Sequence, residues 1–528
     1  MQPMYRINSL ASLFQLLRFV AGIHAHRVAV VDDAGGTDYS ELLAQVQQVA
    51  AGLATAGIQR GHRVAVFAGK DRRLLTLLLA CNAVGAVFVP INPHLKKPQV
   101  LHILGDCSPE LLVSTSHRVA QLDLEAVLPG LRWQAMEMLV ECEPRPEQVN
   151  EWARGAVDSD AAAILYTSGS TGLAKGVVLS QRNLVSGALS VADYLDLESD
   201  DVVLGVLPIS FDAGLSQMTT ALAAGACYVA HEFLSAAQFR RAVQLHRPTV
   251  ITAVPPLWHL ITEAGWGPGS GDSVRLVANT GGHMNEALLE RVTGVFPLAR
   301  PVLMYGLTES FRSTWLPPEE LARHPGSMGR AVPNAQLLVV RPDGTECGPD
   351  EPGELVHRGS FVSLGYLGNP QLNAQRFRPW PLRADRYNQE ELAVWSGDVV
   401  RRDAEGYLYF IGRTDEMLKV SGHRISPTEV ETVLLAMPGV MEAAVFGIPD
   451  ERLGQAIVSC VVLQENAALD QLPALCRKQL PAHMQPASLV CMDALPRNGN
   501  GKIDRGALRA QWLASRQALA TATDEATA

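Results

Sequence analysis

Residues 161–176 read Ala161-Ala-Ala-Ile-Leu-Tyr166-Thr-Ser-Gly-Ser-Thr-Gly-Leu-Ala-Lys175-Gly176. The apolar run predicts a buried strand, and it leads into a loop rich in glycine and hydroxyl side chains and followed by a lysine. Glycines let a backbone approach a ligand closely, and hydroxyl donors and an ammonium suit a polyphosphate. The GxxxxGK[ST] spacing of the common nucleotide-binding loop is absent. The segment therefore predicts a triphosphate loop of another kind, and a flexible Ser/Gly hairpin is the alternative that it allows when taken alone.

The composition describes a globular chain of several domains. It has 528 residues, 47% hydrophobic and 19% charged, with a formal net charge of −10. Since single cores stop growing at about 250–300 residues, roughly two to four domains are expected. The negative charge gives no general reason to bind nucleic acid or an anionic membrane. Residues 10–20 predict an amphipathic first helix rather than a signal sequence, and no apolar run is long enough to span a bilayer. The scattered cysteines suit a reducing compartment. We therefore expect a cytoplasmic location.

The order of predicted elements indicates the fold class. From about residue 27 to residue 304, β-rich runs alternate with helical stretches, which predicts an α/β fold with parallel sheets covered by helices. Residues 326–412 change to short strands and turns, typical of a β-rich subdomain. Residues 413–528 predict a small α+β domain whose Ala/Thr-rich end, residues 518–528, is expected to fray. Strands are predicted, among others, at residues 28–31, 63–67, 161–166, 226–230, 250–253, 276–279 and 301–304.

The string YTSGSTGLAKG at residues 166–176 resembles the signature of the adenylate-forming superfamily of acyl-CoA synthetases, carrier-protein-loading adenylation domains and luciferases. Further matching motifs follow in the family's order. The resemblance implies a large AMP-binding domain at residues 1–412 and a small mobile lid domain at residues 413–528, with a hinge near Asp415. It also implies ATP and Mg²⁺ as cofactors, and CoA or the phosphopantetheine of a carrier protein as the thiol acceptor.

Roles in the large domain follow from the same resemblance. In the second signature, YGLTE, it implies that Tyr305 lies against adenine, Thr308 contacts phosphate and Glu309 coordinates Mg²⁺, which prefers hard carboxylate oxygen. A TxE sequence alone would more often be a helix cap. The adenine-pocket segment corresponds to Gly281, Gly282 and His283. The phosphate loop corresponds to Thr167, Ser168, Gly169, Ser170, Thr171 and Gly172, followed by the catalytic Lys175.

Roles in the C-terminal part rest on four motifs. Asp398, in the sequence WSGD, resembles the aspartate that accepts both ribose hydroxyls. Arg413 matches the arginine that contacts ribose or the α-phosphate. Gly422 and Arg424 belong to the segment implied in thioester formation, and Lys502 matches the mobile catalytic lysine of the adenylation step. Taken alone, the Ser-Gly-Asp sequence would be assigned to a turn and Lys502 to a solvated loop.

Two residues bear on the acid substrate. Phe211-Asp212 matches a pair with which amino-acid-activating members bind the substrate ammonium, and a buried carboxylate with no cationic partner is costly. Asp212 therefore favours an amine-bearing acid. Arg312 could receive a second substrate carboxylate, pair with Asp212 or point outward. The segments at residues 419–424 and 90–93 instead resemble acyl-CoA synthetases.

The implied activity is that of an ATP-dependent carboxylate–thiol ligase. It activates a small carboxylic or amino acid as acyl-AMP, releases pyrophosphate and transfers the acyl group to CoA or a separate carrier protein. Within this class, the alternative is an aminoacyl-carrier-protein ligase. A further alternative is an adenylating enzyme that transfers the acyl group to oxygen or to an amine. The alternative of a different class is a non-catalytic nucleotide-binding protein. Residues 211–214 and 304–313 also resemble a bacterial subgroup of AMP-forming acyl-CoA ligases associated with exosortase gene clusters.

Overall fold

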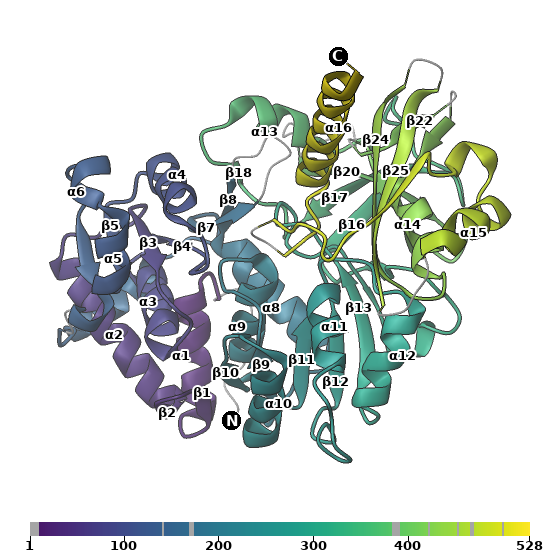
Figure 1. The fold of residues 1–528 in the computed structure, drawn as a ribbon. Coiled ribbons are helices and arrows are strands. Elements are labelled where there is room, and N and C mark those ends of the chain that lie inside the picture. The colour runs from purple at the N-terminus through teal and green to yellow at the C-terminus, as the bar shows by residue number, and fades with distance from the viewer. Residues whose placement is uncertain are drawn as a thin grey trace. The chain divides into compact units, whose positions relative to one another are not determined.

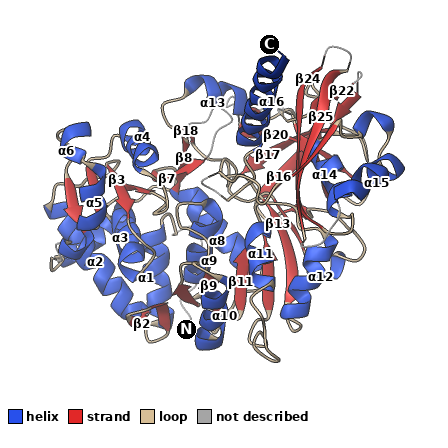
Figure 2. Ribbon diagram, in the orientation of Figure 1, coloured by secondary structure: helices blue, strands red, loops and turns tan. Residues whose placement is uncertain are grey.

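The computed structural model describes residues 10–139, 142–167, 174–382, 391–414, 416–420, 423–450, 453–464, 469–498 and 501–527. Helices and strands alternate along most of the chain, as the α/β prediction requires (Figures 1 and 2). The chain divides into two compact units. The first contains Met1–Leu338 and Val356–Trp395, and the second contains Val339–Leu355 and Ser396–Ala528.

A nine-stranded sheet in the first unit has the order β15-β14-β13-β12-β11-β9-β10-β1-β2. The six adjacent strands β13, β12, β11, β9, β10 and β1 each pair in parallel with the next strand in this order. Central strands such as β11 and β12 are mainly apolar four-residue runs that are buried throughout, which is typical of a parallel sheet covered on both faces. The strands are β1 (Val28–Asp32), β2 (Gly35–Asp38), β9 (Val202–Gly205), β10 (Cys227–Ala230), β11 (Val250–Ala253), β12 (Leu276–Asn279), β13 (Arg300–Tyr305), β14 (Thr314–Leu316) and β15 (Arg330–Ala331).

A seven-stranded sheet in the same unit has the order β18-β8-β7-β4-β3-β5-β6. Strands β7 and β8 form an antiparallel hairpin around the predicted phosphate loop, and β18 adds to the edge at β8. The strands are β3 (Arg63–Phe67), β4 (Val87–Pro90), β5 (Leu111–Ser114), β6 (Trp133–Ala135), β7 (Ala161–Thr167), β8 (Lys175–Ser180) and β18 (Gly365–Tyr366).

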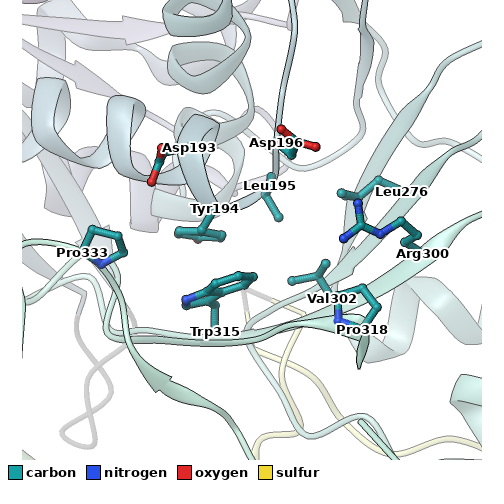
Figure 3. A pocket seen from close by; sticks show the side chains of 10 residues that line it. All are labelled: Asp193, Tyr194, Leu195, Asp196, Leu276, Arg300, Val302, Trp315, Pro318 and Pro333. Atoms are coloured by element: carbon teal, nitrogen blue, oxygen red, sulfur yellow. The ribbon is translucent and has the colours of Figure 1, made fainter. Parts of the chain in front are cut away.

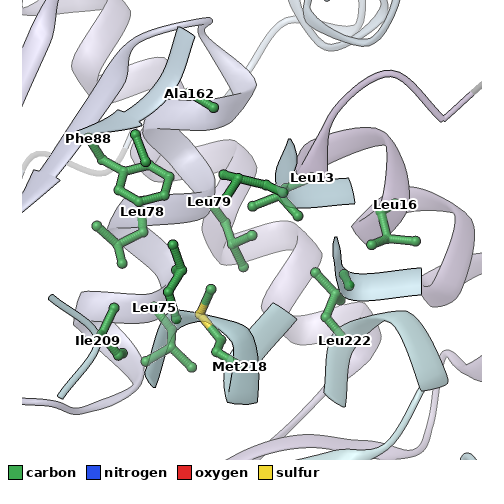
Figure 4. Close-up of a cluster of buried hydrophobic side chains, with 14 of the residues drawn as sticks. Leu13, Leu16, Leu75, Leu78, Leu79, Phe88, Ala162, Ile209, Met218 and Leu222 are labelled. Carbon is green, nitrogen blue, oxygen red and sulfur yellow. The ribbon is translucent and has the colours of Figure 1, made fainter. Parts of the chain in front are cut away.

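The main core of the first unit lies where helices α1 (Leu13–His24), α3 (Arg72–Ala83) and α9 (Asp212–Ala224) meet (Figure 4). Leu13, Leu75 and Met218 belong to this cluster and are almost completely buried. Residues 74–83 of α3 are all buried, because this helix is apolar on every side. Helix α1 confirms the predicted first helix, and the Ser12 side chain caps it by accepting from the Gln15 amide.

The other α-helices of the first unit cover the two sheets and their connections (Figure 1). Helix α8 packs against α9 beside the nine-stranded sheet. These helices are α2 (Tyr39–Thr55), α4 (Lys97–Cys107), α5 (Ser116–Leu122), α6 (Leu124–Val127), α7 (Pro146–Gly155), α8 (Gln181–Tyr194), α10 (Ala236–His246), α11 (Pro255–Thr262), α12 (Glu286–Val295) and α13 (Pro370–Arg376).

Short strands follow in the region predicted to be β-rich. They form a sheet of order β16-β17-β20-β19, with β21 paired to β20. The boundary between the two units falls within β16, β17 and β20. The strands are β16 (Ala335–Val340), β17 (Gly353–Gly359), β19 (Phe377–Pro379), β20 (Leu392–Arg402) and β21 (Leu408–Arg413).

The rest of the second unit is α+β, as predicted. Its sheet has the order β23-β22-β25-β24, with β26 on β25. The elements are β22 (Leu418–Val420), β23 (His423–Ile425), α14 (Pro427–Leu435), β24 (Val440–Asp450), β25 (Gly454–Leu463), α15 (Leu472–Gln479), β26 (Ser488–Cys491) and α16 (Arg505–Thr527). The end that the sequence predicts to fray, residues 518–528, follows directly on the rest of α16, whose bounds extend to Thr527. Among the described residues, every helix is too short or too polar to cross a bilayer.

Candidate active site

The predicted nucleotide and acid residues of the first unit follow neighbouring strands of the nine-stranded sheet. Gly281 comes just after β12, Tyr305 ends β13, and Glu309 lies in the turn that follows. Asp212 begins α9, after β9. Because β9, β11, β12 and β13 are parallel neighbours, their carboxyl ends share one edge. Ligands of open α/β sheets bind at this edge.

Asn279, the last residue of β12, shapes the predicted adenine segment. Its buried side chain donates through Nδ2 to the Gly282 carbonyl oxygen at 2.9 Å. Gly281 has a φ of +73°, a conformation that glycine adopts without strain. Gly281, Gly282 and His283 are all exposed. This turn therefore presents accessible backbone against which a planar ring can lie.

Thr308 and Glu309 are both half-buried in the turn after β13. The Tyr366 hydroxyl donates to Glu309 Oε1 at 2.5 Å, and the Ser363 amide donates to the Glu309 carbonyl oxygen at 2.9 Å. One carboxylate beside one hydroxyl is a hard-oxygen donor set. It fits a Mg²⁺ ion that takes its other ligands from phosphate and water.

The predicted phosphate-loop residues Ser168, Gly169, Ser170, Thr171 and Gly172 lie outside the described residues. The two ends of this loop are described: Thr167 ends β7, Lys175 begins β8, and the two residues pair across the hairpin. A Cβ at position 176 would lie 2.8 Å from Ile164 Cγ2, so Gly176 is required for this close crossing. Both Thr167 and Lys175 are half-buried.

Helix α4 contacts both ends of that loop, through residues that the sequence motifs did not indicate. The Tyr166 hydroxyl donates to Asp106 Oδ2 at 2.5 Å, and His102 Nε2 donates to the Ala174 carbonyl oxygen at 2.8 Å. Burial and the Asp106 carboxylate raise the pKa of the Tyr166 hydroxyl, so it stays protonated as a donor. His102 and Asp106 are four residues apart on one helix face, and this spacing was the only signal in the sequence.

Asp212 and Arg312 form an ion pair. The Arg312 guanidinium lies 3.5 Å from Asp212 Oδ2, and Arg312 also donates to the Phe311 carbonyl oxygen at 2.9 Å. Of the three alternatives for Arg312, the structure shows the pairing with Asp212, so this carboxylate has a cationic partner and needs no substrate ammonium to balance its charge. Arg312 is 2% exposed, which also excludes the outward orientation. A cavity of about 20 Å³ beside Arg312 is lined by Ser216 and Thr252, among others.

The backbone at Phe311 directs Arg312 inward. Phe311 has a φ of 51°, which is strained for a bulky side chain. Its ring is fully buried against α8, where a Cβ at Gly187 would lie 2.4 Å from the ring. Tight packing thus holds the turn that places Arg312 next to Asp212.

A larger pocket of about 330 Å³ lies at the opposite end of the sheet (Figure 3). It includes Leu276 and Arg300, the first residues of β12 and β13. The rings of Tyr194 and Trp315 stack in it, with centroids 5.2 Å apart. None of the predicted site residues lines this pocket.

In the second unit, Asp398 and Arg413 are partners across strands β20 and β21. Arg413 donates to Asp398 Oδ1 at 2.7 Å, and the Asp398 side chain is 3% exposed. The Ser396 hydroxyl accepts from the Asp398 amide at 3.0 Å and donates to the Leu355 carbonyl oxygen at 2.7 Å. This aspartate is thus fixed by its neighbours on both strands.

Lys502 is exposed in a turn that Asn498 closes. The Lys502 amide donates to Asn498 Oδ1 at 3.1 Å, and the Asn498 amide donates to the Lys502 carbonyl oxygen at 2.8 Å. Asp415 and Gly422 lie outside the described residues. Arg424 is in β23, opposite Lys419 of β22.

The chain matches one protein family over most of its length. Residues 17–367 match the AMP-binding enzyme family, and residues 429–502 match the AMP-binding enzyme C-terminal domain. The chain therefore belongs to the AMP-binding enzymes, within the adenylate-forming superfamily that its motifs resemble. The resemblance to the exosortase-associated subgroup stays a prediction.

Its relatives include ligases with different thiol acceptors. Indoleacetate–CoA ligase of Aromatoleum aromaticum is 31% identical, over 93% of this chain and 96% of that protein. L-proline–[L-prolyl-carrier protein] ligase of Pseudomonas fluorescens is 28% identical, over 92% and 97%. The crystal structure of ATP-bound MatB from Rhodopseudomonas palustris is 27% identical, with a TM-score of 0.82 over 95% of this chain and 99% of that chain.

Proposed function

We propose that this protein is an AMP-forming acid–thiol ligase that uses MgATP to activate a small carboxylic acid. The observation that carries the proposal is the gathering of Gly281–His283, Tyr305–Glu309 and Asp212 at one carboxyl edge of a parallel sheet. Family membership supports it, as does the presence of both CoA ligases and carrier-protein ligases among the relatives.

In the first step, an oxygen of the substrate carboxylate attacks the α-phosphorus of ATP. The bond from that phosphorus to the bridging oxygen breaks, so acyl-AMP forms and pyrophosphate leaves. The exposed turn at Gly281 and the ring of Tyr305 receive the adenine, while Lys175 and Thr308 contact phosphate. Glu309 and Thr308 would hold the Mg²⁺ ion, which offsets phosphate charge when bound. Lys502 offsets the negative charge that develops at the reacting oxygens.

In the second step, the sulfur of a thiol attacks the acyl carbon. The bond between acyl carbon and AMP oxygen breaks, AMP leaves, and the thiol proton passes to solvent. The resemblance assigns the segment containing Gly422 and Arg424 to this step, with residues 413–528 acting as a lid that turns about Asp415. Positioning accounts for most of the catalysis, since no side chain forms a covalent bond to the acyl group.

CoA is the acceptor that we propose first, because the motif at residues 419–424 resembles that of acyl-CoA synthetases. A carrier-protein thiol is the second candidate. Asp212 supports it, since this carboxylate lies where amino-acid-activating members bind an ammonium. Its pairing with Arg312 weakens that support, because an incoming ammonium would compete with the guanidinium.

Product analysis tests the proposal. The purified protein is incubated with MgATP, CoA and a panel of acids, and nucleotides and thioesters are separated by chromatography. We expect AMP, pyrophosphate and an acyl-CoA in equal amounts, each dependent on the acid. Formation of ADP and phosphate, or of an ester or amide instead of a thioester, would contradict it.

A further inference from the structure

The hydroxyl of Tyr366 contacts the carboxylate of Glu309, although the two residues come from distant parts of the first unit. We propose that Tyr366 is a positioning residue that holds the Glu309 carboxylate in the orientation in which it binds the Mg²⁺ of MgATP. This inference rests on the proposed function, which assigns the metal to Glu309.

Glu309 is held at two points by one segment. Its Oε1 accepts from the Tyr366 hydroxyl at 2.5 Å, and its carbonyl oxygen accepts from the Ser363 amide at 2.9 Å. One bond fixes the main chain and the other fixes the far end of the side chain. Together they restrict the torsions between the two ends, which a glutamate at a surface turn would otherwise leave free.

Tyr366 is itself rigidly placed. Its amide donates to Asn373 Oδ1 at 2.7 Å, and Asn373 Nδ2 donates back to the Tyr366 carbonyl oxygen at 3.0 Å. Its ring, in a residue that is 7% exposed, packs edge-on against Phe377 with centroids 5.8 Å apart. A donor with so little freedom of its own can fix the direction of the carboxylate that it contacts.

The strand pairing extends this connection to the phosphate loop. Tyr366 pairs with Val177 of β8, the strand that begins at Lys175. The Leu367 amide also donates to the Gly176 carbonyl oxygen at 2.8 Å. The short strand β18 thus contacts both the Glu309 carboxylate, which would bind Mg²⁺, and β8, which begins at the end of the loop that would hold the triphosphate.

The hydroxyl leaves the carboxylate able to bind a metal. A carboxylate has about four lone-pair sites and Tyr366 uses one, so oxygen donors remain for Mg²⁺. Loss of a partner that orients a metal ligand typically lowers metal affinity by about 10- to 100-fold.

The test removes only the hydroxyl. Metal-dependent binding of ATP is measured by calorimetry, and Mn²⁺ binding in the presence of ATP by electron paramagnetic resonance. We expect Tyr366→Phe to raise the half-saturating metal concentration by about 10-fold or more. Tyr39→Phe is the matched control. It also removes a buried hydroxyl, one that donates to the Ala226 carbonyl oxygen at 2.7 Å, but in a residue that makes no contact with Glu309.

Two further variants separate positioning from general support of the fold. Phe377→Leu loosens the packing of Tyr366 but keeps its hydroxyl, so thermal stability should fall while metal dependence changes less than in Tyr366→Phe. In a Glu309→Gln background, Tyr366→Phe should add little to the loss of metal binding. An unchanged metal dependence in Tyr366→Phe, or a full 10-fold shift in both backgrounds, would overturn the inference. Absence of metal-dependent ATP binding in the unmodified protein would overturn the proposed function as well.

Discussion

The Arg312 guanidinium lies 3.5 Å from the Asp212 carboxylate, and the arginine is almost completely buried. The pair is electrically neutral as a whole. A substrate ammonium that approached Asp212 would have to compete with Arg312, and a displaced buried guanidinium is costly without another anion. We therefore expect the proposed acid site to favour acids with an uncharged tail, or acids that carry both an ammonium and a second carboxylate.

Replacement of Arg312 by glutamine should weaken binding of the acid and not of ATP. We expect the Michaelis constant for the activated acid to rise about 10- to 100-fold, because Asp212 loses its cationic partner and leaves an unpaired negative charge beside the bound acid. Steady-state kinetics with each substrate varied in turn measures this. Arg300→Gln is the control, since Arg300 lies in the pocket at the other end of β13. Equal changes in both Michaelis constants would contradict the placement of Arg312 in the acid site.

Loss of the contact between Tyr166 and Asp106 should weaken ATP binding. Tyr166→Phe and Asp106→Ala each remove the 2.5 Å bond at one end of the phosphate loop, so we expect either to raise the Michaelis constant for ATP roughly 5- to 10-fold. Because both variants break the same bond, the double variant should lose little more than the singles. Fully additive effects would show that the two residues act separately.

His357 should make stability sensitive to acid. It is 1% exposed, and its Nδ1 is 2.8 Å from the Ser313 hydroxyl oxygen. Burial lowers the pKa of His357 to about 3. In the unfolded chain, His357 takes up a proton at its ordinary pKa of about 6.5, whereas in the folded chain it stays neutral until the pH is much lower. Stability should fall as pH drops below about 6.5, by about 1.4 kcal/mol per pH unit until the folded pKa is approached.

Thermal unfolding between pH 7 and pH 4 measures this effect. His357→Leu should flatten the acid part of the curve, even if its stability at pH 7 is lower. The control His117→Gln changes an exposed histidine and should leave the slope as it is. Identical slopes in the unmodified protein and in His357→Leu would contradict a neutral buried His357.

Much of the fold was predictable because local patterns determine it. The predicted strands at residues 63–67, 250–253 and 276–279 agree residue for residue with β3, β11 and β12. Each is a short, mainly apolar run, which is typical of a buried parallel strand. At the C-terminal end, the alanine-rich composition that suggested fraying also has a high helix propensity, and α16 extends to Thr527.

The contacts around the candidate site were less predictable because they join distant segments. Asp212 and Arg312 are 100 residues apart, and Glu309 and Tyr366 are 57 apart. Sequence motifs identify residues that contact a ligand, but they do not indicate which neighbouring residues hold those residues in place. His102, Asp106 and Tyr366 belong to segments without a distinctive motif, so only the three-dimensional structure connects them to the site.

Asp398 should determine whether the enzyme distinguishes ribose from deoxyribose. Arg413 donates to its carboxylate and the Ser396 hydroxyl accepts from its amide, and the carboxylate can accept from two hydroxyls. We expect Asp398→Asn to weaken ATP binding by about 10- to 100-fold and to have much less effect on 2′,3′-dideoxy-ATP. Calorimetric titration with both nucleotides measures this. An equal loss for both would show that Asp398 contacts another part of the nucleotide.

Acid-dependent exchange of pyrophosphate into ATP tests the central claim most directly. The panel contains simple acids, amino acids, amino-blocked analogues and amino diacids, and the comparison is with Lys502→Ala. We predict exchange with at least one class of acid, lowered by about 100-fold or more in the variant because a charge-stabilising group is lost. The effective acid also tests the conclusion drawn from the Asp212–Arg312 pair. Binding of MgATP without exchange for any acid would contradict the account and favour a non-catalytic nucleotide-binding protein.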